Sequence, residues 1–127
     1  MREDFSAGGP AFDARVERRS DVPVVRLYGE VDLGAIPRIE EALAEAAALR
    51  DGIPGLVLDL SAVTFMDSTG IGVLIGQRGE LGEARLWLVL GAGDARQTLQ
   101  LAGVDGVFRV STDLEAAVRE AREAAGR

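Results

Sequence analysis

Apolar and polar residues follow one another along the chain in a way that predicts five strands. Apolar and charged residues alternate from Phe12 to Arg18, which is typical of a strand exposed on one face. A turn at Ser20-Asp21 leads to an apolar segment from Pro23 to Tyr28, and we expect these two strands to pair as a hairpin. Nearly continuous apolar runs, typical of parallel strands covered on both faces, follow at Leu56–Leu60 and Arg85–Leu90, with a short last strand at Val107–Val110.

Apolar residues at helical spacing predict four helices after these strands. The first covers roughly Gly34 to Arg50, with Asp32 placed to cap or precede it. The others run from about Ser68 to Leu81, from Asp94 to Ala102, and over Leu114–Ala121 after a capping-box pattern at Thr112–Glu115. The order β-β-α-β-α-β-α-β-α predicts an α/β fold with a largely parallel sheet.

Five glycines interrupt the second predicted helix, and each costs about 1 kcal/mol in a helix interior. Glycines persist where a backbone must lie close to a neighbour, and we expect that neighbour to be the sheet. These glycines are Gly70, Gly72, Gly76, Gly79 and Gly82.

The composition excludes several kinds of active site. A chain of 127 residues is the size of one domain and can bury enough surface to fold without a disulfide or a metal. The sequence contains neither cysteine nor histidine, so thiol nucleophiles, Ser-His and Cys-His pairs and the common zinc sites are excluded.

Charge and hydropathy favour a protein that binds neither nucleic acid nor membrane. The formal net charge is −7, whereas non-specific nucleic-acid binding needs a basic face. A basic protein partner is compatible with this charge. No apolar run is long enough to cross a bilayer, and the N-terminal residues lack the apolar core of a signal peptide. We therefore expect a cytoplasmic protein.

The polar stretch Asp67-Ser68-Thr69-Gly70 lies between a predicted buried strand and a predicted helix, and two interpretations fit it. Aspartate and serine are favoured helix caps, so capping alone explains the stretch. Alternatively, a phosphate on Ser68 would add about −1.5 to −2 charges at a helix N-terminus, which tolerates an anion, while Asp67 and Asp32 would repel it. The residues by themselves leave both interpretations open.

Other polar or aromatic groups favour structural roles. Asp59 has no partner that the sequence identifies, so we assign it to a strand end rather than to a metal or an acid catalyst. Trp87 lies in an apolar run and is predicted to be a core residue. Glu40-Glu41 and Glu80–Glu83 predict solvated helix faces. No dinucleotide fingerprint or phosphate-binding loop motif occurs.

The segment FMDSTGIGVLIG, Phe65 to Gly76, resembles the phosphorylation-site segment of STAS domains of the bacterial anti-sigma-factor antagonist type. Weaker matches in the expected order extend the resemblance over residues 12–122; they lie at Leu27–Asp32, Leu56–Ser61 and Leu99–Val110. The resemblance implies a single STAS-type α/β domain, with a mixed, mostly parallel sheet of four to five strands packed with about four helices. A flexible tail at 1–11 and a C-terminal end at 123–127 would flank it.

The resemblance also implies a function. Members of this family are not enzymes and need neither cofactor nor metal. The unphosphorylated antagonist binds an anti-sigma factor, itself a serine kinase using ATP and Mg²⁺, and so frees the sigma factor in stress-response or sporulation-like regulation. Phosphorylation releases the antagonist, and a PP2C-like phosphatase restores it. The phosphorylated serine corresponds to Ser68, and Asp32, Asp67, Thr69 and Gly70 are its expected partner-binding neighbourhood. We expect a monomer.

Two positions depart from the family pattern. Thr69 stands where many relatives have a second serine and would be a minor phosphoacceptor. Leu33-Gly34 follows Asp32, where relatives often carry polar residues, which leaves partner specificity open. Two other functions are kept as alternatives: a STAS subunit of a transport or other signalling assembly without a serine switch, and weak nucleotide binding.

Overall fold

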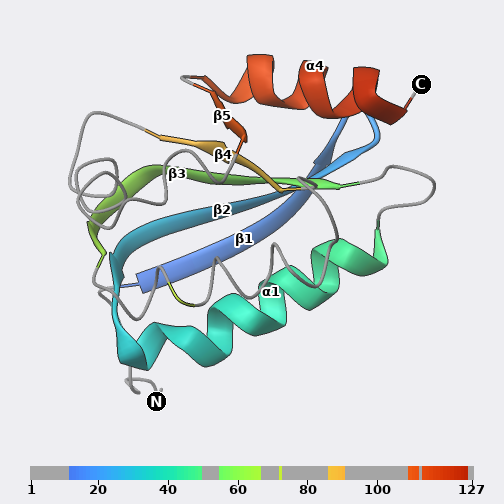
Figure 1. Cartoon of the computed structure of the whole chain (residues 1–127). Coiled ribbons are helices and arrows are strands. Elements are labelled where there is room, and N and C mark those ends of the chain that lie inside the picture. The colour runs from blue at the N-terminus through green and yellow to red at the C-terminus, as the bar shows by residue number, and fades with distance from the viewer. Residues whose placement is uncertain are drawn as a thin grey trace.

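The computed structural model consists of one five-stranded sheet with a helix against each face (Figure 1). It describes residues 12–49, 55–66, 72, 86–90, 109–111 and 113–125. The elements along the chain are β1 (Phe12–Arg19), β2 (Val22–Val31), the 3₁₀ turn η2 (Leu33–Ala35), α1 (Ile36–Ala48), β3 (Leu56–Met66), β4 (Leu86–Val89), β5 (Arg109–Ser111) and α4 (Leu114–Ala125).

The strands lie in the order β1-β2-β3-β4-β5. β1 and β2 pair antiparallel, joined by a turn in which Ser20 and Asp21 both have positive φ, and all later pairs are parallel. The predicted hairpin and the predicted mixed, mostly parallel sheet of an α/β fold are confirmed. Two of the four predicted helices, at 68–81 and 94–102, lie outside the described residues except for Gly72, which is helical.

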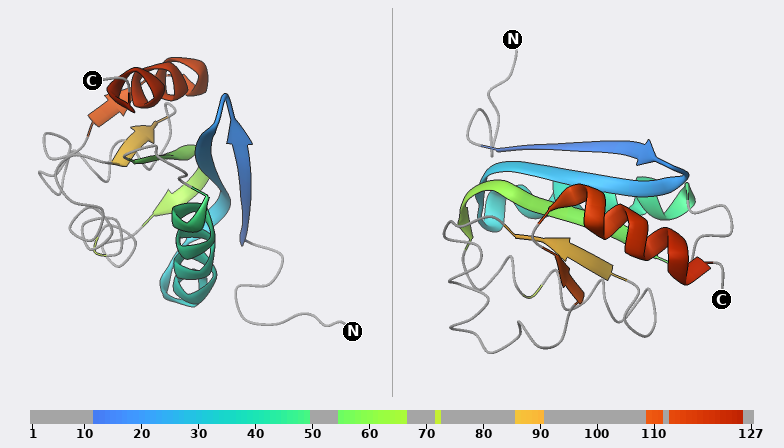
Figure 2. Two further views of the ribbon diagram at one scale, coloured as in Figure 1. Left: turned by 90° about the vertical axis from the view of Figure 1, so that its right-hand side faces the viewer. Right: turned by 90° about the horizontal axis from the view of Figure 1, so that it is seen from above.

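The larger core lies between the sheet and α1 (Figure 2). Alternate residues of β2, β3 and β4 point to this face and meet the apolar side of α1, which the 3.6-residue spacing predicts. Its fully buried members include Val25, Leu27, Ile39, Leu43, Leu58 and Leu88.

A smaller core lies on the opposite face, under α4. The intervening residues of the same strands contribute Val24, Val57 and Trp87, and α4 contributes Ala117 and Ala121. Trp87 is buried, so its predicted core role is confirmed; the Arg109 guanidinium lies 5.3 Å from its ring centroid. Because both faces are covered, the central strands are apolar on both sides.

Helix α4 begins differently from the predicted capping box. The carboxylate of Asp113 accepts a hydrogen bond from the backbone N–H of Ala116 at 2.7 Å, so Asp113 is the N-cap. The capping-box pattern had placed the cap at Thr112, which lies outside the described residues. The observed cap lies one residue after the predicted one. Asp113 takes this role because an aspartate directly before the helix can accept the N–H of the third helical residue.

Two other predictions require correction. Gly72 is exposed, and a Cβ built on it would have no neighbour within 4 Å, so close approach to the sheet does not explain this glycine. Strand β3 continues six residues beyond the predicted end at Leu60, to Met66, because these residues pair with the last residues of β2. Glu40 and Glu41 are exposed on α1, as predicted.

Candidate functional site

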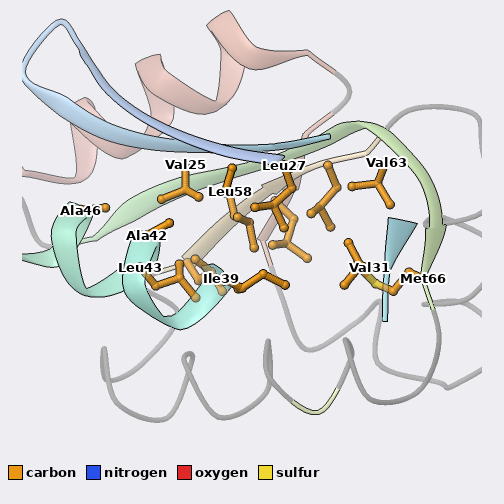
Figure 3. Packing of buried hydrophobic residues seen from close by; sticks show 14 of the residues in the cluster. Val25, Leu27, Val31, Ile39, Ala42, Leu43, Ala46, Leu58, Val63 and Met66 are labelled. Carbon is orange, nitrogen blue, oxygen red and sulfur yellow. The ribbon is translucent and has the colours of Figure 1, made fainter. Parts of the chain in front are cut away.

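The candidate site lies where β2 and β3 end. These strands are parallel neighbours, and Val31, the last residue of β2, is the register partner of Met66, the last residue of β3. Both side chains are buried, with 1% and 2% of their surfaces exposed. They lie together at one end of the core above α1 (Figure 3). The chain therefore leaves both strands at the same edge of the sheet.

The end of β3 is irregular. Its pairing with β2 shifts register twice, once between Arg26 and Tyr28 and once between Gly29 and Glu30, and each shift inserts one extra residue into β3. Such bulges bend a strand and re-aim its side chains, and they are common beside functional sites. The final part of β3 curls toward the α1 side of the sheet (Figure 1). Phe65 is thereby left exposed while the adjacent Met66 is buried.

Asp32 follows Val31 directly and caps the turn that leads into α1. Its backbone is extended, and its Oδ1 accepts a hydrogen bond from the N–H of Gly34 at 3.0 Å. Its carbonyl accepts another from the N–H of Ala35 at 3.0 Å. Asp32 therefore caps the 3₁₀ turn and precedes α1, whose own N-cap, Ala35, makes no side-chain capping hydrogen bond. Asp32 is only partly buried, so it remains in part accessible at this end of the sheet.

The other predicted site residues, Asp67, Ser68, Thr69 and Gly70, lie outside the described residues. The structure brings Asp32 and the strand that leads into this segment to one edge, as the sequence predicted. The phosphorylation of Ser68 and the roles of its neighbours stay predictions.

An ion pair between Arg26 and Asp59 was missed by the sequence analysis. Asp59 is 3% exposed and lies in the middle of β3; its Oδ2 accepts a hydrogen bond from Arg26 Nε at 3.2 Å. Its Oδ1 accepts two more, from the backbone N–H of Ser61 at 2.9 Å and from Ser61 Oγ at 2.6 Å. The predicted strand-end role of Asp59 is therefore wrong. The one indication of this pair in the sequence is that Arg26 and Asp59 are each the single charge in an apolar predicted strand.

Two arginines lie close to the Tyr28 ring on the same face of the sheet as this pair. The guanidinium groups of Arg15 and Arg26 lie 5.7 Å and 5.8 Å from the ring centroid. These contacts and the ion pair link β1, β2 and β3 on this face of the sheet. Within the described ranges, no three acidic side chains come together in a way that would hold a metal ion. No helix in the same ranges is both long and apolar enough to cross a bilayer.

Comparisons with known proteins agree with this geometry. The family model of the STAS domain matches residues 13–117. The chain is 33% identical over 108 residues to the anti-sigma-F factor antagonist RsfB of Mycobacterium tuberculosis, a match that covers 84% of this chain and 87% of that protein.

Solved structures of similar fold include two antagonists of this kind. The crystal structure of an anti-sigma factor antagonist from Mycobacterium paratuberculosis superposes with a TM-score of 0.78 at 32% identity, covering 87% of this chain and 94% of that one. The phosphorylated form of the Bacillus cell fate determinant SpoIIAA superposes with a TM-score of 0.58 at 25% identity, covering 85% and 99%. Sequence and fold agree, and the chain belongs to the STAS domain family.

Proposed function

We propose that this chain is an anti-sigma-factor antagonist that works by phosphorylation-controlled binding. Its unphosphorylated form binds an anti-sigma factor that is a serine kinase, and this releases a sigma factor. The kinase transfers phosphate to Ser68, which ends the interaction, and a PP2C-like phosphatase reverses the modification. The protein acts as a non-catalytic binding partner in the cytoplasm.

The pairing of Val31 with Met66 carries this proposal. Ser68 follows Met66 by two residues, so covalent geometry alone keeps its Cα within about 7 Å of the Met66 Cα. Asp32 follows Val31 by one residue. A hydroxyl that can accept phosphate and two carboxylates, Asp32 and Asp67, are thus drawn from the ends of adjacent strands.

The effect of a phosphate at this edge follows from its charge. Phosphorylation adds about −1.5 to −2 charges at neutral pH. The edge already carries the Asp32 carboxylate, and the whole chain carries a formal net charge of −7. A partner that docks there would strip water from the phosphate, and this desolvation cost weakens binding without unfolding the domain, even where the partner carries basic residues.

The relatives support the same function. RsfB is named as an anti-sigma-F factor antagonist, and the match covers most of both chains. SpoIIAA was solved in a phosphorylated form, so a protein of similar fold accepts a phosphate. The alternative of a transport-associated STAS subunit has no comparable support.

The proposal is tested by capture from the native cytoplasm in the presence of Mg²⁺ and ATP. The baits are the full chain, Ser68→Ala, and Thr69→Ala as a neighbouring hydroxyl control. We expect an ATP-binding kinase with all three baits and most strongly with Ser68→Ala. We also expect phosphate on the wild-type and Thr69→Ala chains at Ser68. Recovery of transporter subunits without a kinase would favour the alternative.

A further inference from the structure

Two exposed apolar side chains flank the candidate site. The large apolar residues that stand exposed in the described part of the chain are Leu33 at 72%, Phe65 at 45% and Val110 at 37%. A single exposed apolar side chain is ordinary, whereas apolar side chains gathered beside a functional site mark an interaction surface. Leu33 and Phe65 lie at the ends of the neighbouring strands β2 and β3, whereas Val110 lies on β5, two strands away from β3.

The register of the sheet limits how far apart Leu33 and Phe65 lie. Phe65 precedes Met66, and Leu33 is two residues beyond Val31, the partner of Met66. With 3.8 Å between successive Cα atoms and about 5 Å between strands, their Cα atoms are at most about 17 Å apart. One protein partner covering about 800 Å² would reach both.

Both side chains project from ordered backbone. The turn that carries Leu33 is held by the hydrogen bond from the Gly34 N–H to Asp32. Phe65 is held by its pairing with Glu30 and by the burial of Met66 beside it. Apolar anchors on preorganised backbone cost less entropy to dock than anchors on a loose loop.

We propose that Leu33 and Phe65 form the apolar contact patch that the anti-sigma-factor kinase covers when it binds this chain. This inference rests on the proposed function and adds the docking residues to it. The acidic residues Glu30 and Asp32 border the patch, since Glu30 is exposed beside Phe65 and Asp32 precedes Leu33. The matching surface on the kinase is therefore apolar with lysine or arginine at its rim.

A second copy of this chain fits the patch less well. An isologous contact places the same surface on both sides, so the acidic borders of two patches would face each other. Each copy also carries a formal net charge of −7. Like charges brought together in this way oppose self-association and favour a basic partner.

The test measures the Kd of the unphosphorylated full chain for the captured kinase, by calorimetry with a non-hydrolysable ATP analogue. We expect Leu33→Ser and Phe65→Ser each to weaken binding about tenfold or more, because both remove a central apolar anchor. Val110→Ser, the matched control, leaves the Kd unchanged. Thermal unfolding checks that each variant is folded. If Phe65→Ser does not fold, Leu33→Ser alone tests the contact patch.

The outcomes separate the two proposals. If the wild-type chain does not bind the kinase at all, the proposed function fails. If the wild-type chain binds and Leu33→Ser binds with equal affinity, the contact patch alone is wrong. Sedimentation showing that the wild-type chain dimerises and Leu33→Ser does not would assign the patch to self-association and overturn the inference.

Discussion

Val31 and Met66 are register partners at the ends of two parallel strands, and both side chains are buried beside the first turn of α1. This pair places the ends of both strands side by side. Asp32 caps the turn on one side, and Asp67 and Ser68 follow on the other.

The charge of Asp32 can be tested separately from its capping role. Asn is as good a cap as Asp, so Asp32→Asn keeps an oxygen for the Gly34 N–H and removes the charge. If phosphorylated Ser68 lies beside Asp32, the carboxylate opposes the second ionisation of the phosphate and raises its pKa. We expect Asp32→Asn to lower this second pKa by a few tenths of a unit to about one unit. A ³¹P NMR titration measures it.

The control for this titration is Asp113→Asn, which removes a charge while keeping the cap of α4. The phosphate on Ser68 of this variant should have the same second pKa as in the wild-type chain. Equal second pKa values in the wild-type chain and in Asp32→Asn would show that Asp32 is not a neighbour of the phosphate.

The ion pair of Arg26 with Asp59 contributes to stability. Arg26→Met removes a donor from a buried carboxylate, and we expect it to lower the free energy of unfolding by about 1.5–3 kcal/mol. Arg15→Met is the matched control, because Arg15 also contacts Tyr28 but pairs with an exposed carboxylate, that of Asp13. An exposed pair contributes about 0–1 kcal/mol. Urea unfolding that gave equal losses for both variants would contradict this assignment.

Replacing a core leucine should lower the free energy of unfolding much more than replacing a surface leucine. Leu58 is fully buried between the sheet and α1, so Leu58→Ala leaves a cavity and should cost about 2–5 kcal/mol. Leu33 is 72% exposed, and we expect Leu33→Ala to change the free energy of unfolding by no more than about 0.5 kcal/mol. Chemical denaturation of both variants measures the contrast. A comparable loss in both would mean that Leu33 belongs to the core and not to a docking patch.

The structure places the N-cap of α4 at Asp113, whereas the sequence pattern predicts it at Thr112. Asp113→Ala removes the acceptor for the Ala116 N–H and should destabilise the protein by about 0.5–2 kcal/mol. Thr112→Ala should cost less, because Asp113 already supplies the capping hydrogen bond. Thermal unfolding of both variants decides which residue is the cap. A larger loss of stability for Thr112→Ala than for Asp113→Ala would support the predicted capping box.

The fold was largely predictable because its elements have simple periods. Alternation in β1 and helical spacing in α1 are each set by which face meets the core. The end of β3 was not predictable, since residues 61–66 mix polar and apolar positions and two bulges interrupt the period of two. The pairing of Arg26 with Asp59 joins residues 33 positions apart, and only the strand register brings them together.

The candidate site, too, could be predicted from the sequence only in part. The place of Asp32 at a strand end, ahead of the first helix, followed from local chemistry, and the structure shows it capping the 3₁₀ turn that leads into α1. The choice of Ser68 as a phosphoacceptor rested on the resemblance, because a cap and a phosphorylation site use the same residue types. The exposure of Phe65 depended on the bulged end of β3 and needed the structure.

The most direct test of the switch compares the affinity of the kinase for the chain with and without phosphate on Ser68. The kinase phosphorylates the full chain with Mg²⁺ and ATP, mass spectrometry locates the phosphate, and calorimetry with a non-hydrolysable ATP analogue gives both Kd values. We expect one phosphate, on Ser68, and binding about tenfold weaker or more, with Ser68→Ala retaining the unphosphorylated affinity in ATP. A phosphate elsewhere, or equal affinity of the two forms, would contradict the switch.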